Sequence, residues 1–462
     1  MKLLIVVVAV LGTAYLMQRA LGAGETNNRE PDVQAILKER VVAWKAGGIV
    51  VGIVDERGVR VISEGVVDGP GSAAVNGDTV FEIGSATKVF TATLLADMIG
   101  RGEMRLDDPV AKFLPDSVKV PSRNGREITL VDLVTHTSGL PRLPDNLKPA
   151  DGNNPYADYT VEQMYAFLSG HKLRRDIGSK YEYSNFGMGL LGHAIALKAG
   201  TNYESLVIER ICRPLGMEST RITLSPELKA RLAKGHGETG EPVGNWDLPT
   251  LAGAGALRST ANDLLKFISA NLGFTSNSLS PALQKTHEIH FRSAEPGLDI
   301  ALAWHVYHKF RKDIIWHNGG TGGYHSFIGF DPAARRGVLV LANSANNIDD
   351  IALHLLDGRF PLEEYEPPSV RTVVKVDPKI YDAYAGRYEL APNVYFTIRR
   401  NGDRLMAQLT GQSSFEVFPE SETNFFYKVV DAQLTFVKDE KGVVTGLVLH
   451  QNGQNPEARK VE

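Results

Sequence analysis

The order of strand-like and helix-like runs along the chain is the feature that most constrains its fold. A hairpin pattern occupies residues 48–68, and three further apolar runs separated by turn residues lie within 313–344. Between them, residues 106–272 carry mostly helical patterns and long loops, and a last helical pattern covers 348–358. We expect the early and late strands to meet in one mainly antiparallel sheet flanked by helices, with the central residues as a helical insert, an α+β arrangement.

Start and stop signals delimit several of the expected helices. The first covers 31–44, and an apolar helix in the central region ends at Gly200. A short helix lies within 128–141, where glycine and proline stop it. In a later helix, Ser259 is the expected N-cap and Gly273 the stop.

The C-terminal part of the chain has a different texture. Residues 361–379 are rich in proline and charge and are predicted to form a linker. Beyond them, apolar and polar residues alternate, with hairpin signals at the Asn-Gly pair 401–402 and the Lys-Gly pair 441–442. Residues 380–462 are therefore predicted to form a separate all-β domain, a barrel or a strongly curved sheet.

The composition is that of an ordinary globular protein. The 462 residues are 43% hydrophobic and 23% charged, which is enough for two or three domains with sizeable cores. The formal net charge is -4 and no polybasic stretch occurs, so no nucleic-acid partner is expected. With Cys212 as the one cysteine, no intrachain disulfide is possible.

The N-terminus has the pattern of an export signal. Lys2 precedes an apolar run over 3–16, which is short for a membrane span, and small residues follow. Residues 1–23 are therefore predicted to be a signal peptide, with an uncleaved anchor as the alternative. Both place the folded part outside the cytoplasm, periplasmic or secreted, and no stable membrane span is expected after cleavage.

The stretch "FEIGSATKVF" raises the first question of chemistry. Ser85 follows a strand-like run and opens a helix, and Lys88 lies one turn further on the same face. A serine hydroxyl needs an adjacent base to become a nucleophile, and a partly buried lysine with a lowered pKa can serve. The alternative is that Ser85 only caps the helix. The same spacing recurs at Ser169 and Lys172, but there a glycine breaks the helix between them.

Two further stretches hold polar groups suited to the same chemistry. In "YEYSNFG", the Tyr183 phenol becomes a base only where a cation such as Lys88 lowers its pKa, and Asn185 offers both a donor and an acceptor to an amide. The alternative is a turn in which Asn185 caps the following helix.

In "WHNGGTGGYHSF", a strand ends in four glycines within 319–323. Such a strand lets an extended substrate approach its backbone, and its N–H groups can hold an oxyanion. The alternative is a flexible β-turn. The residues of interest here are His317, Asn318, Gly319 and Gly320.

In this order and at these separations, the three stretches resemble the motifs of the serine penicillin-recognising enzymes. The resemblance is to the class C β-lactamases and to the DD-peptidases and esterases grouped with them. It also includes "ITLVDLVTHTSGLP", "PLGMEST" and "AGALRSTANDL". It covers roughly residues 31–358, and residues 31–360 are expected to form the catalytic domain. The stretch "DDPVAKFLPDSVKVPSRNGREITL" looks most like the periplasmic D-alanyl-D-alanine carboxypeptidase/endopeptidase branch. The tail resembles small β domains appended to some members.

The resemblance implies a role for each site residue. Ser85 is the acyl-accepting nucleophile, and Lys88 and Tyr183 share the proton transfers. Asn185 positions the amide of the acyl side chain. The N–H groups of Ser85 and Gly320 form the oxyanion hole. The strand from His317 through Asn318 and Gly319 docks the substrate.

One departure from the family pattern affects the expected substrate. Most class C β-lactamases carry lysine and threonine where this chain has His317 and Asn318. Histidine is mostly neutral at pH 7 and binds a carboxylate less firmly, which favours peptide or ester substrates over efficient β-lactam turnover.

The expected function is that of an exported serine hydrolase without metal or cofactor. Its substrate is a small molecule or peptide: a β-lactam, a D-Ala-D-Ala-type peptide or an ester. Two alternatives remain open: an esterase or D-aminopeptidase on the same scaffold, and a penicillin-binding sensor that stays acylated. The spaced histidine pairs at 287/290 and 305/308 lack a metal-site pattern and are expected to be packing or surface residues. His136 is expected to belong to a structural loop.

Overall fold

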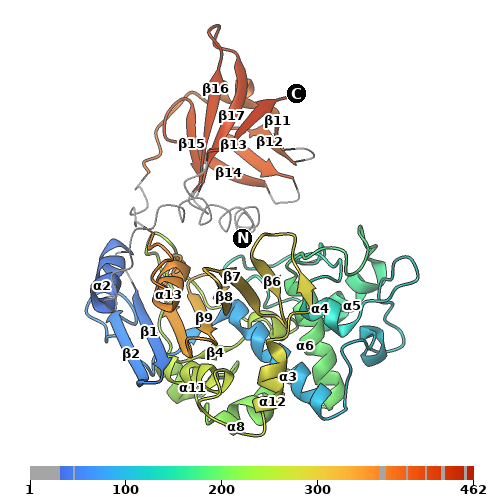
Figure 1. Cartoon of the computed structure of the whole chain (residues 1–462). Helices are drawn as coiled ribbons and strands as arrows, with labels where there is room; N and C mark the ends of the chain where they lie inside the picture. The colour runs from blue at the N-terminus through green and yellow to red at the C-terminus, as the bar shows by residue number, and fades with distance from the viewer. Residues whose placement is uncertain are drawn as a thin grey trace. The chain divides into compact units, whose positions relative to one another are not determined.

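The computed structural model describes residues 32–44, 47–363, 371–391, 394–410, 414–427, 432–451 and 455–462. These residues form two compact units, one within Glu25–Tyr365 and the other within Glu366–Glu462. Figure 1 shows the helices and sheet of the first unit and the strands of the second. The predicted signal peptide and residues 364–370 of the predicted linker lie outside the described residues.

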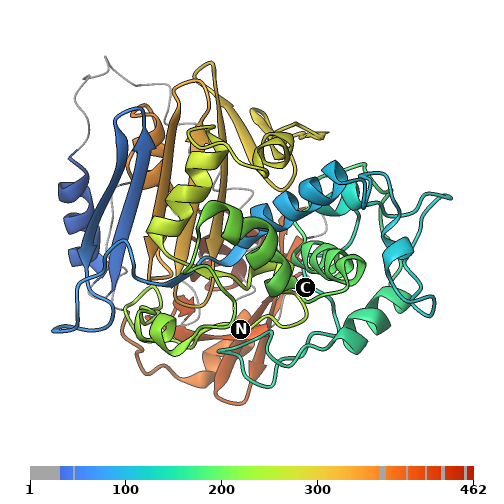
Figure 2. The same ribbon diagram turned by 90° about the horizontal axis from the view of Figure 1, so that it is seen from below.

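An eight-stranded antiparallel sheet forms the frame of the first unit. Its order is β2-β1-β10-β9-β8-β7-β6-β5, so the N-terminal hairpin pairs directly with the last strand of the unit. This confirms the predicted meeting of early and late strands (Figure 2). The strands are β1 (Gly48–Asp55), β2 (Gly58–Gly65), β5 (Phe291–Arg292), β6 (Leu298–Ile300), β7 (His305–Lys309), β8 (Lys312–Gly320), β9 (His325–Asp331) and β10 (Arg336–Ala342).

Both faces of the central strands are buried, because helices cover them. In β1, Ile49, Val51 and Ile53 pack with α2 (Val33–Trp44) and α13 (Asp349–Leu356) in one core. The alternate residues Val50 and Val54 belong to the larger core on the other face, together with α11 (Ala261–Asn271). The near-continuous apolar sequence of β1 follows from this double burial.

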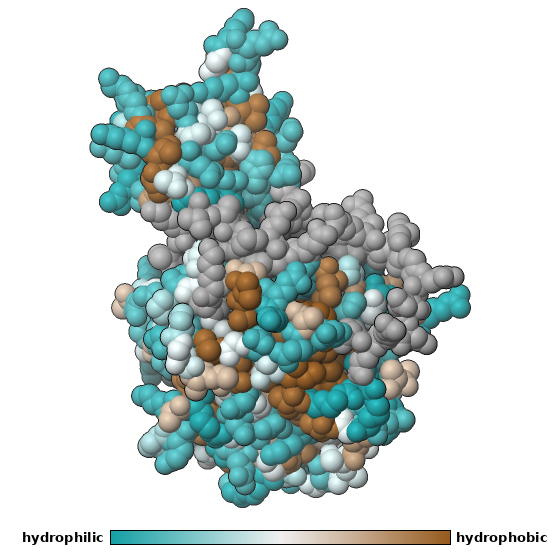
Figure 3. Space-filling view, turned by 90° about the vertical axis from the view of Figure 1, so that its left-hand side faces the viewer, coloured by the Kyte–Doolittle hydropathy of each residue, from teal (hydrophilic) through white to brown (hydrophobic). Residues whose placement is uncertain are grey.

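The edge strand β2 is only partly covered. Val59 and Val61 on β2 and Val42 on α2 are exposed. Figure 3 shows the side of the molecule that carries these two elements, where apolar atoms lie among a larger hydrophilic area. Charged side chains such as Arg60 and Glu64 on β2 keep this edge from pairing with another strand.

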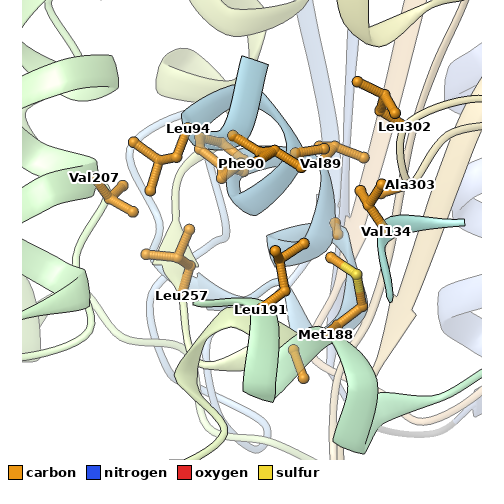
Figure 4. Close-up of a cluster of buried hydrophobic side chains, with 14 of the residues drawn as sticks. Val89, Phe90, Leu94, Val134, Met188, Leu191, Val207, Leu257, Leu302 and Ala303 are labelled. Carbon is orange, nitrogen blue, oxygen red and sulfur yellow. The ribbon is translucent and has the colours of Figure 1, made fainter. Parts of the chain in front are cut away.

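The helix that follows Ser85 passes through the centre of the larger core. It is α3 (Thr87–Gly100), and all of its residues from Thr87 to Met98 are buried. Figure 4 shows Val89, Phe90 and Leu94 of this helix surrounded by apolar side chains of other segments. A helix buried all round is fixed in position by its packing, so Lys88 is fixed with it.

The remaining helices of the first unit lie mainly in the insert. They are α4 (Leu130–Val134), α5 (Val161–Gly170), α6 (Asn185–Ala199), α7 (Tyr203–Val207), α8 (Arg213–Leu215), α9 (Pro226–Ala230), α10 (Ala252–Gly255) and α12 (Ser280–Thr286). A short two-stranded sheet joins β3 (Phe81–Glu82) to β4 (Arg258–Ser259).

Two of the predicted helix ends were wrong. The N-cap of α11 is Thr260, whose side chain accepts from the Asp263 N–H, because Ser259 is in β4 and its hydroxyl contacts Thr220 at 2.7 Å. The short helix α4 ends at Val134, well before the glycine and proline, because His136 has a left-handed backbone with φ 58°.

The second unit is a closed antiparallel barrel, as the alternation predicted. Its strands are β11 (Gly386–Ala391), β12 (Val394–Asn401), β13 (Arg404–Leu409), β14 (Ser414–Pro419), β15 (Asn424–Tyr427), β16 (Gln433–Lys438), β17 (Val444–His450) and β18 (Glu457–Lys460). A short helix, α14 (Tyr381–Tyr384), precedes them. Tyr384, Tyr388 and Phe436 are among the buried side chains of the barrel core. No helix within the described residues has the length and apolar character needed to cross a membrane.

Candidate active site

Ser85 lies in a tight turn between a strand and the buried helix. The turn is a 3₁₀ segment, Gly84–Ala86, between β3 and α3. Gly84 has φ +49°, and a Cβ there would lie 2.9 Å from the Gly320 nitrogen, so glycine is required. Ser85 is half-buried among buried neighbours. Its hydroxyl contacts Lys88, and the N-cap of α3 is Ala86, so this serine does not cap the helix.

The Lys88 amine contacts three oxygen atoms. Its Nζ lies 2.9 Å from Ser85 Oγ, and it donates to Asn185 Oδ1 at 2.8 Å and to the Ala254 carbonyl at 2.6 Å. The side chain is fully buried. Burial, together with the charge of Arg142, holds the pKa of Lys88 well below its usual 10.5.

The partners of Lys88 assign its lone pair. A neutral amine has two N–H bonds and one lone pair, and the Asn185 and Ala254 oxygens can only accept. With both N–H bonds used, the lone pair is left for the hydroxyl of Ser85. A lysine amine in its neutral form, placed in this way, can accept a proton from a serine hydroxyl.

Tyr183 and Asn185 reach the site from the start of α6. The N-cap is Ser184, whose hydroxyl accepts from the Gly187 N–H at 2.8 Å, so Asn185 is free of that task. Lys88 Nζ lies 4.8 Å from the centre of the Tyr183 ring. Burial raises the pKa of Tyr183 to about 12, although the Arg142 charge and the neighbouring Ser85 side chain oppose the shift. The phenol is therefore protonated at neutral pH, which contradicts our expectation that a cation would make it a base.

Two buried histidines contact the Tyr183 ring, and a third stacks on one of them. His136 stacks on the Tyr183 ring with 4.5 Å between centres, and its Nδ1 accepts from the Ser184 N–H at 3.1 Å. His305 stacks on His317 at 5.1 Å. Burial, reinforced by neighbouring positive charge, holds the pKa of His136 and of His317 well below 6.5, and burial lowers that of His305 to about 4. His136, which the sequence placed in a structural loop, fixes both the backbone and the ring of the Tyr183 segment.

Strand β8 provides a backbone edge next to Ser85. A Cβ at Gly319 would lie 2.7 Å from the Ser85 nitrogen and inside contact distance of the Ile83 carbonyl. The absence of a side chain at this position therefore lets the strand lie against the turn that carries Ser85.

The hydrogen-bond ladder directs two β8 residues toward an open edge. The Thr321 N–H donates to the Tyr324 carbonyl, so these two residues form a hydrogen-bonded pair next to the end of β8. Hydrogen-bonded and non-hydrogen-bonded pairs alternate along an antiparallel ladder, so the next pair, Gly320 with His325, is not hydrogen-bonded. Gly320 and Asn318 thus direct their N–H and C=O groups away from β9. The strand on that side, β7, begins at His305 opposite Trp316, so among the described residues no strand covers these groups.

The side chains of Asn318 and His317 lie on opposite faces of β8, and only that of His317 lies beside Tyr183. The Asn318 amide lies on the opposite face of β8 and donates to Asp349 Oδ2 at 2.6 Å. The His317 ring faces Tyr183, with 6.3 Å between ring centres, but it is fully buried. Its Nδ1 donates to the Asn318 carbonyl at 2.5 Å, so the proton of the neutral ring is on Nδ1.

The second Ser-x-x-Lys match is not a site. Ser169 is exposed, lies in the last turn of α5 and accepts from the Lys119 backbone N–H at 3.1 Å, and Lys172 is exposed in the following loop. Within the described ranges, no group of three or more histidine, cysteine, aspartate or glutamate side chains is placed to hold a metal ion.

Sequence reasoning missed two contributors to the site. The Ala254 carbonyl is a backbone group in α10, and no residue type signals its contact with Lys88. Arg142 lies with its guanidinium carbon 5.0 Å from the centre of the Tyr183 ring. It closes the "HTSGLPR" stretch, and one arginine after a loop gives no signal of where its side chain lies.

The family model for beta-lactamases matches residues 33–356, which include all of these residues. The chain belongs to the beta-lactamase family. With Ser85, Lys88 and Tyr183 together, it is a serine hydrolase of that family. Residues 370–459 match a second model, described as a domain of unknown function, DUF3471.

Named relatives include both hydrolase types expected from the sequence. The D-alanyl-D-alanine-carboxypeptidase/endopeptidase AmpH of Escherichia coli K12 is 32% identical over 308 residues, 62% of this chain and 78% of the relative. A beta-lactamase of Lysobacter lactamgenus is 26% identical over 379 residues, 74% of this chain and 92% of the relative. Among solved structures, the D-alanine carboxypeptidase AmpC from Burkholderia cenocepacia is 27% identical with a TM-score of 0.61, covering 71% of this chain and 98% of its own.

Proposed function

We propose that this hydrolase cleaves the amide of D-Ala-D-Ala-type peptides, and acts on the β-lactam amide as a poorer substrate, through an acyl-enzyme on Ser85. The observation that carries the proposal is the Lys88 amine, which is buried and holds two oxygen acceptors while its lone pair is left for Ser85 Oγ at 2.9 Å. The names of the carboxypeptidase and beta-lactamase relatives support the substrate class.

Acylation starts with proton transfer from Ser85 to Lys88. The depressed pKa favours the neutral form of the amine, and a neutral amine accepts the proton as Ser85 Oγ attacks the carbonyl carbon. Negative charge then develops on the carbonyl oxygen. The N–H groups of Ser85 and Gly320, close together because Gly84 and Gly319 lack side chains, are placed to receive it.

Collapse of the tetrahedral intermediate requires a proton for the leaving nitrogen. Tyr183, protonated and close to Ser85 and Lys88, is placed to give it and to recover a proton from Lys88. In deacylation the same groups act in reverse, with water in place of the amine. Asn185 uses its oxygen on Lys88, so its NH₂ remains to donate to the amide carbonyl of the acyl side chain.

The open edge of β8 supports an extended peptide substrate. The Asn318 N–H and the backbone groups of Gly320, which point away from β9, offer hydrogen bonds to a chain laid alongside the strand. A buried, neutral His317 supplies no positive charge at this edge, so β8 itself offers no cation to the carboxylate of a peptide or of a penicillin.

An esterase is the second candidate, and the same neutral His317 favours it because an ester need not carry a carboxylate. A panel of a D-Ala-D-Ala peptide, a penicillin and a short-chain nitrophenyl ester, measured for wild type and Ser85→Ala, separates the candidates. The proposal expects peptide cleavage that Ser85→Ala abolishes. Ester turnover alone supports the esterase, and a permanent adduct without product supports a penicillin sensor.

We also propose that the protein is exported and acts in the periplasm or outside the cell, on the basis of the pattern in residues 1–23. N-terminal sequencing of the protein from cell fractions tests this. A periplasmic or secreted chain that begins near residue 24 agrees with the proposal, and an intact N-terminus on cytoplasmic protein contradicts it.

A further inference from the structure

Arg142 places a positive charge beside the reactive group. Its guanidinium carbon lies 5.0 Å from the centre of the Tyr183 ring, and Lys88 Nζ lies 4.8 Å from the same centre. The side chain is half-buried and therefore partly open to solvent. No ion pair or hydrogen bond of the Arg142 guanidinium is formed with any residue that the structure describes, so its five N–H donors remain available.

The backbone around Arg142 is held, although its side chain is not. The Pro141 carbonyl accepts from Ser184 Oγ at 2.6 Å, and the Arg142 carbonyl accepts from the Phe186 N–H at 3.1 Å. Both bonds attach this loop to the turn that carries Tyr183 and Asn185. The backbone of Arg142 thus has a fixed position relative to the site, and its side chain extends from there to the Tyr183 ring.

The other cationic candidates near Ser85 are occupied. Lys88 is fully buried and its contacts are with Ser85, Asn185 and Ala254. His317 is fully buried and its one N–H, on Nδ1, is bonded to the Asn318 carbonyl. Neither can meet an incoming carboxylate without giving up these contacts, whereas Arg142 can bind one with two parallel hydrogen bonds.

We propose that Arg142 binds a carboxylate on the leaving-group side of the substrate, so that the preferred peptides end in a free carboxylate. The side follows from the proposed function, on which this inference rests: Tyr183 protonates the leaving nitrogen, and Arg142 lies over its ring. In this proposal the substrate carboxylate binds to the loop that precedes α5, and not to β8.

The charge of Arg142 also acts on the reactive groups. It lowers the pKa of Lys88, and it partly offsets the increase that burial causes in the pKa of Tyr183. A carboxylate bound to the guanidinium offsets this field, so Lys88 becomes a stronger base when a substrate with the right terminus is in place.

The test compares paired substrates that differ only in this carboxylate. The first pair is an acyl-D-Ala-D-Ala peptide and its C-terminal amide. The second is a phenyl ester with a carboxylate on the leaving group and the same ester with a carboxamide. The readout is the ratio of kcat/KM for the acid to kcat/KM for its amide partner, measured with the full-length protein.

Wild type is expected to prefer the acid of each pair, and Arg142→Gln to lower the ratio by roughly 10- to 100-fold, as loss of hydrogen bonds to a charged group predicts. Arg142→Lys keeps the charge but not the paired donors and should retain part of the preference. Arg174→Gln, which removes an exposed arginine from a neighbouring loop, should leave the ratio as in wild type. Unchanged thermal unfolding midpoints show that the variants are folded.

A ratio that Arg142→Gln does not change, or a wild type without preference for either acid, overturns the inference. Failure of the proposed function gives a different result: neither peptide is cleaved. The ester pair still measures the ratio in that case, so the two ideas fail separately.

Discussion

Gly319→Ala is the substitution that most directly tests how β8 and the Ser85 turn fit together. The added methyl group would lie 2.7 Å from Ser326 Oγ and 2.7 Å from the Ser85 nitrogen, and inside contact distance of the Ile83 carbonyl. Two of these three atoms are backbone atoms of the turn, which cannot rotate away. The strand and the turn must therefore separate.

The size of the effect follows from the two consequences of this separation. Overpacking at one methyl group costs about 1–3 kcal/mol, so the unfolding midpoint should fall by a few degrees. Displacement of one oxyanion donor typically lowers kcat about 10²- to 10³-fold. We therefore expect acylation to fall by about that factor in a variant that is still folded.

Gly320→Ala is the matched control. A Cβ there meets only the Tyr324 carbonyl at 3.9 Å, an ordinary contact, and the N–H is kept. Its stability should lie within about 0.5 kcal/mol of wild type, and its acylation should fall much less than that of Gly319→Ala. Stopped-flow acylation by a chromogenic ester, with thermal unfolding of each variant, gives both quantities. A Gly319→Ala enzyme that acylates like wild type would refute the close-approach argument.

Three further predictions follow from Lys88 and Tyr183. Lys88→Met should lower acylation by about 10²- to 10⁴-fold, the range for loss of a general base, and rapid-quench kinetics that find less than a tenfold loss would count against Lys88 as the base. Tyr183→Phe should slow peptide cleavage by a similar factor but affect nitrophenyl esters far less, because a nitrophenolate leaves without a proton; equal losses on both substrates would contradict its role as the acid. Burial lowers the pKa of Lys88 below that of the unfolded chain, so the unfolded chain binds the proton more tightly, and the stability of wild type relative to Lys88→Met should rise as pH increases from the folded-state pKa toward 10.5. Chemical denaturation over this range measures the difference, which a pH-independent result would contradict.

The sequence predicted the elements of this fold because their signals are local. The double-sided burial of β1 is visible as a continuous apolar run, and the end of α6 is visible as Gly200, whose φ of 66° suits glycine. The alternation beyond residue 380 likewise predicted the barrel. The start of α11 was harder to predict, because Ser259 and Thr260 are both good N-cap residues and only the pairing of β4 decides between them.

The parts of the site that depend on residue type could be predicted from the sequence. The parts that depend on how a side chain is buried or directed could not. Ser85 and Lys88 could be chosen over Ser169 and Lys172 from the strand before and the helix after them. The protonated state of Tyr183 was not predictable, since it depends on how deeply the ring is buried. The direction of the Asn318 side chain follows from strand register, which a sequence does not reveal before the strands are paired.

The central claim is that Ser85 takes up the acyl group, and intact mass spectrometry after brief exposure to a penicillin tests it most directly. The account predicts one adduct of the full mass of the drug, because ring opening releases no fragment, located by peptide mapping on the segment that carries Ser85. Ser85→Ala should gain no mass under the same conditions. No adduct on wild type together with unimpaired hydrolysis by Ser85→Ala, or the same adduct on both proteins, would contradict the account.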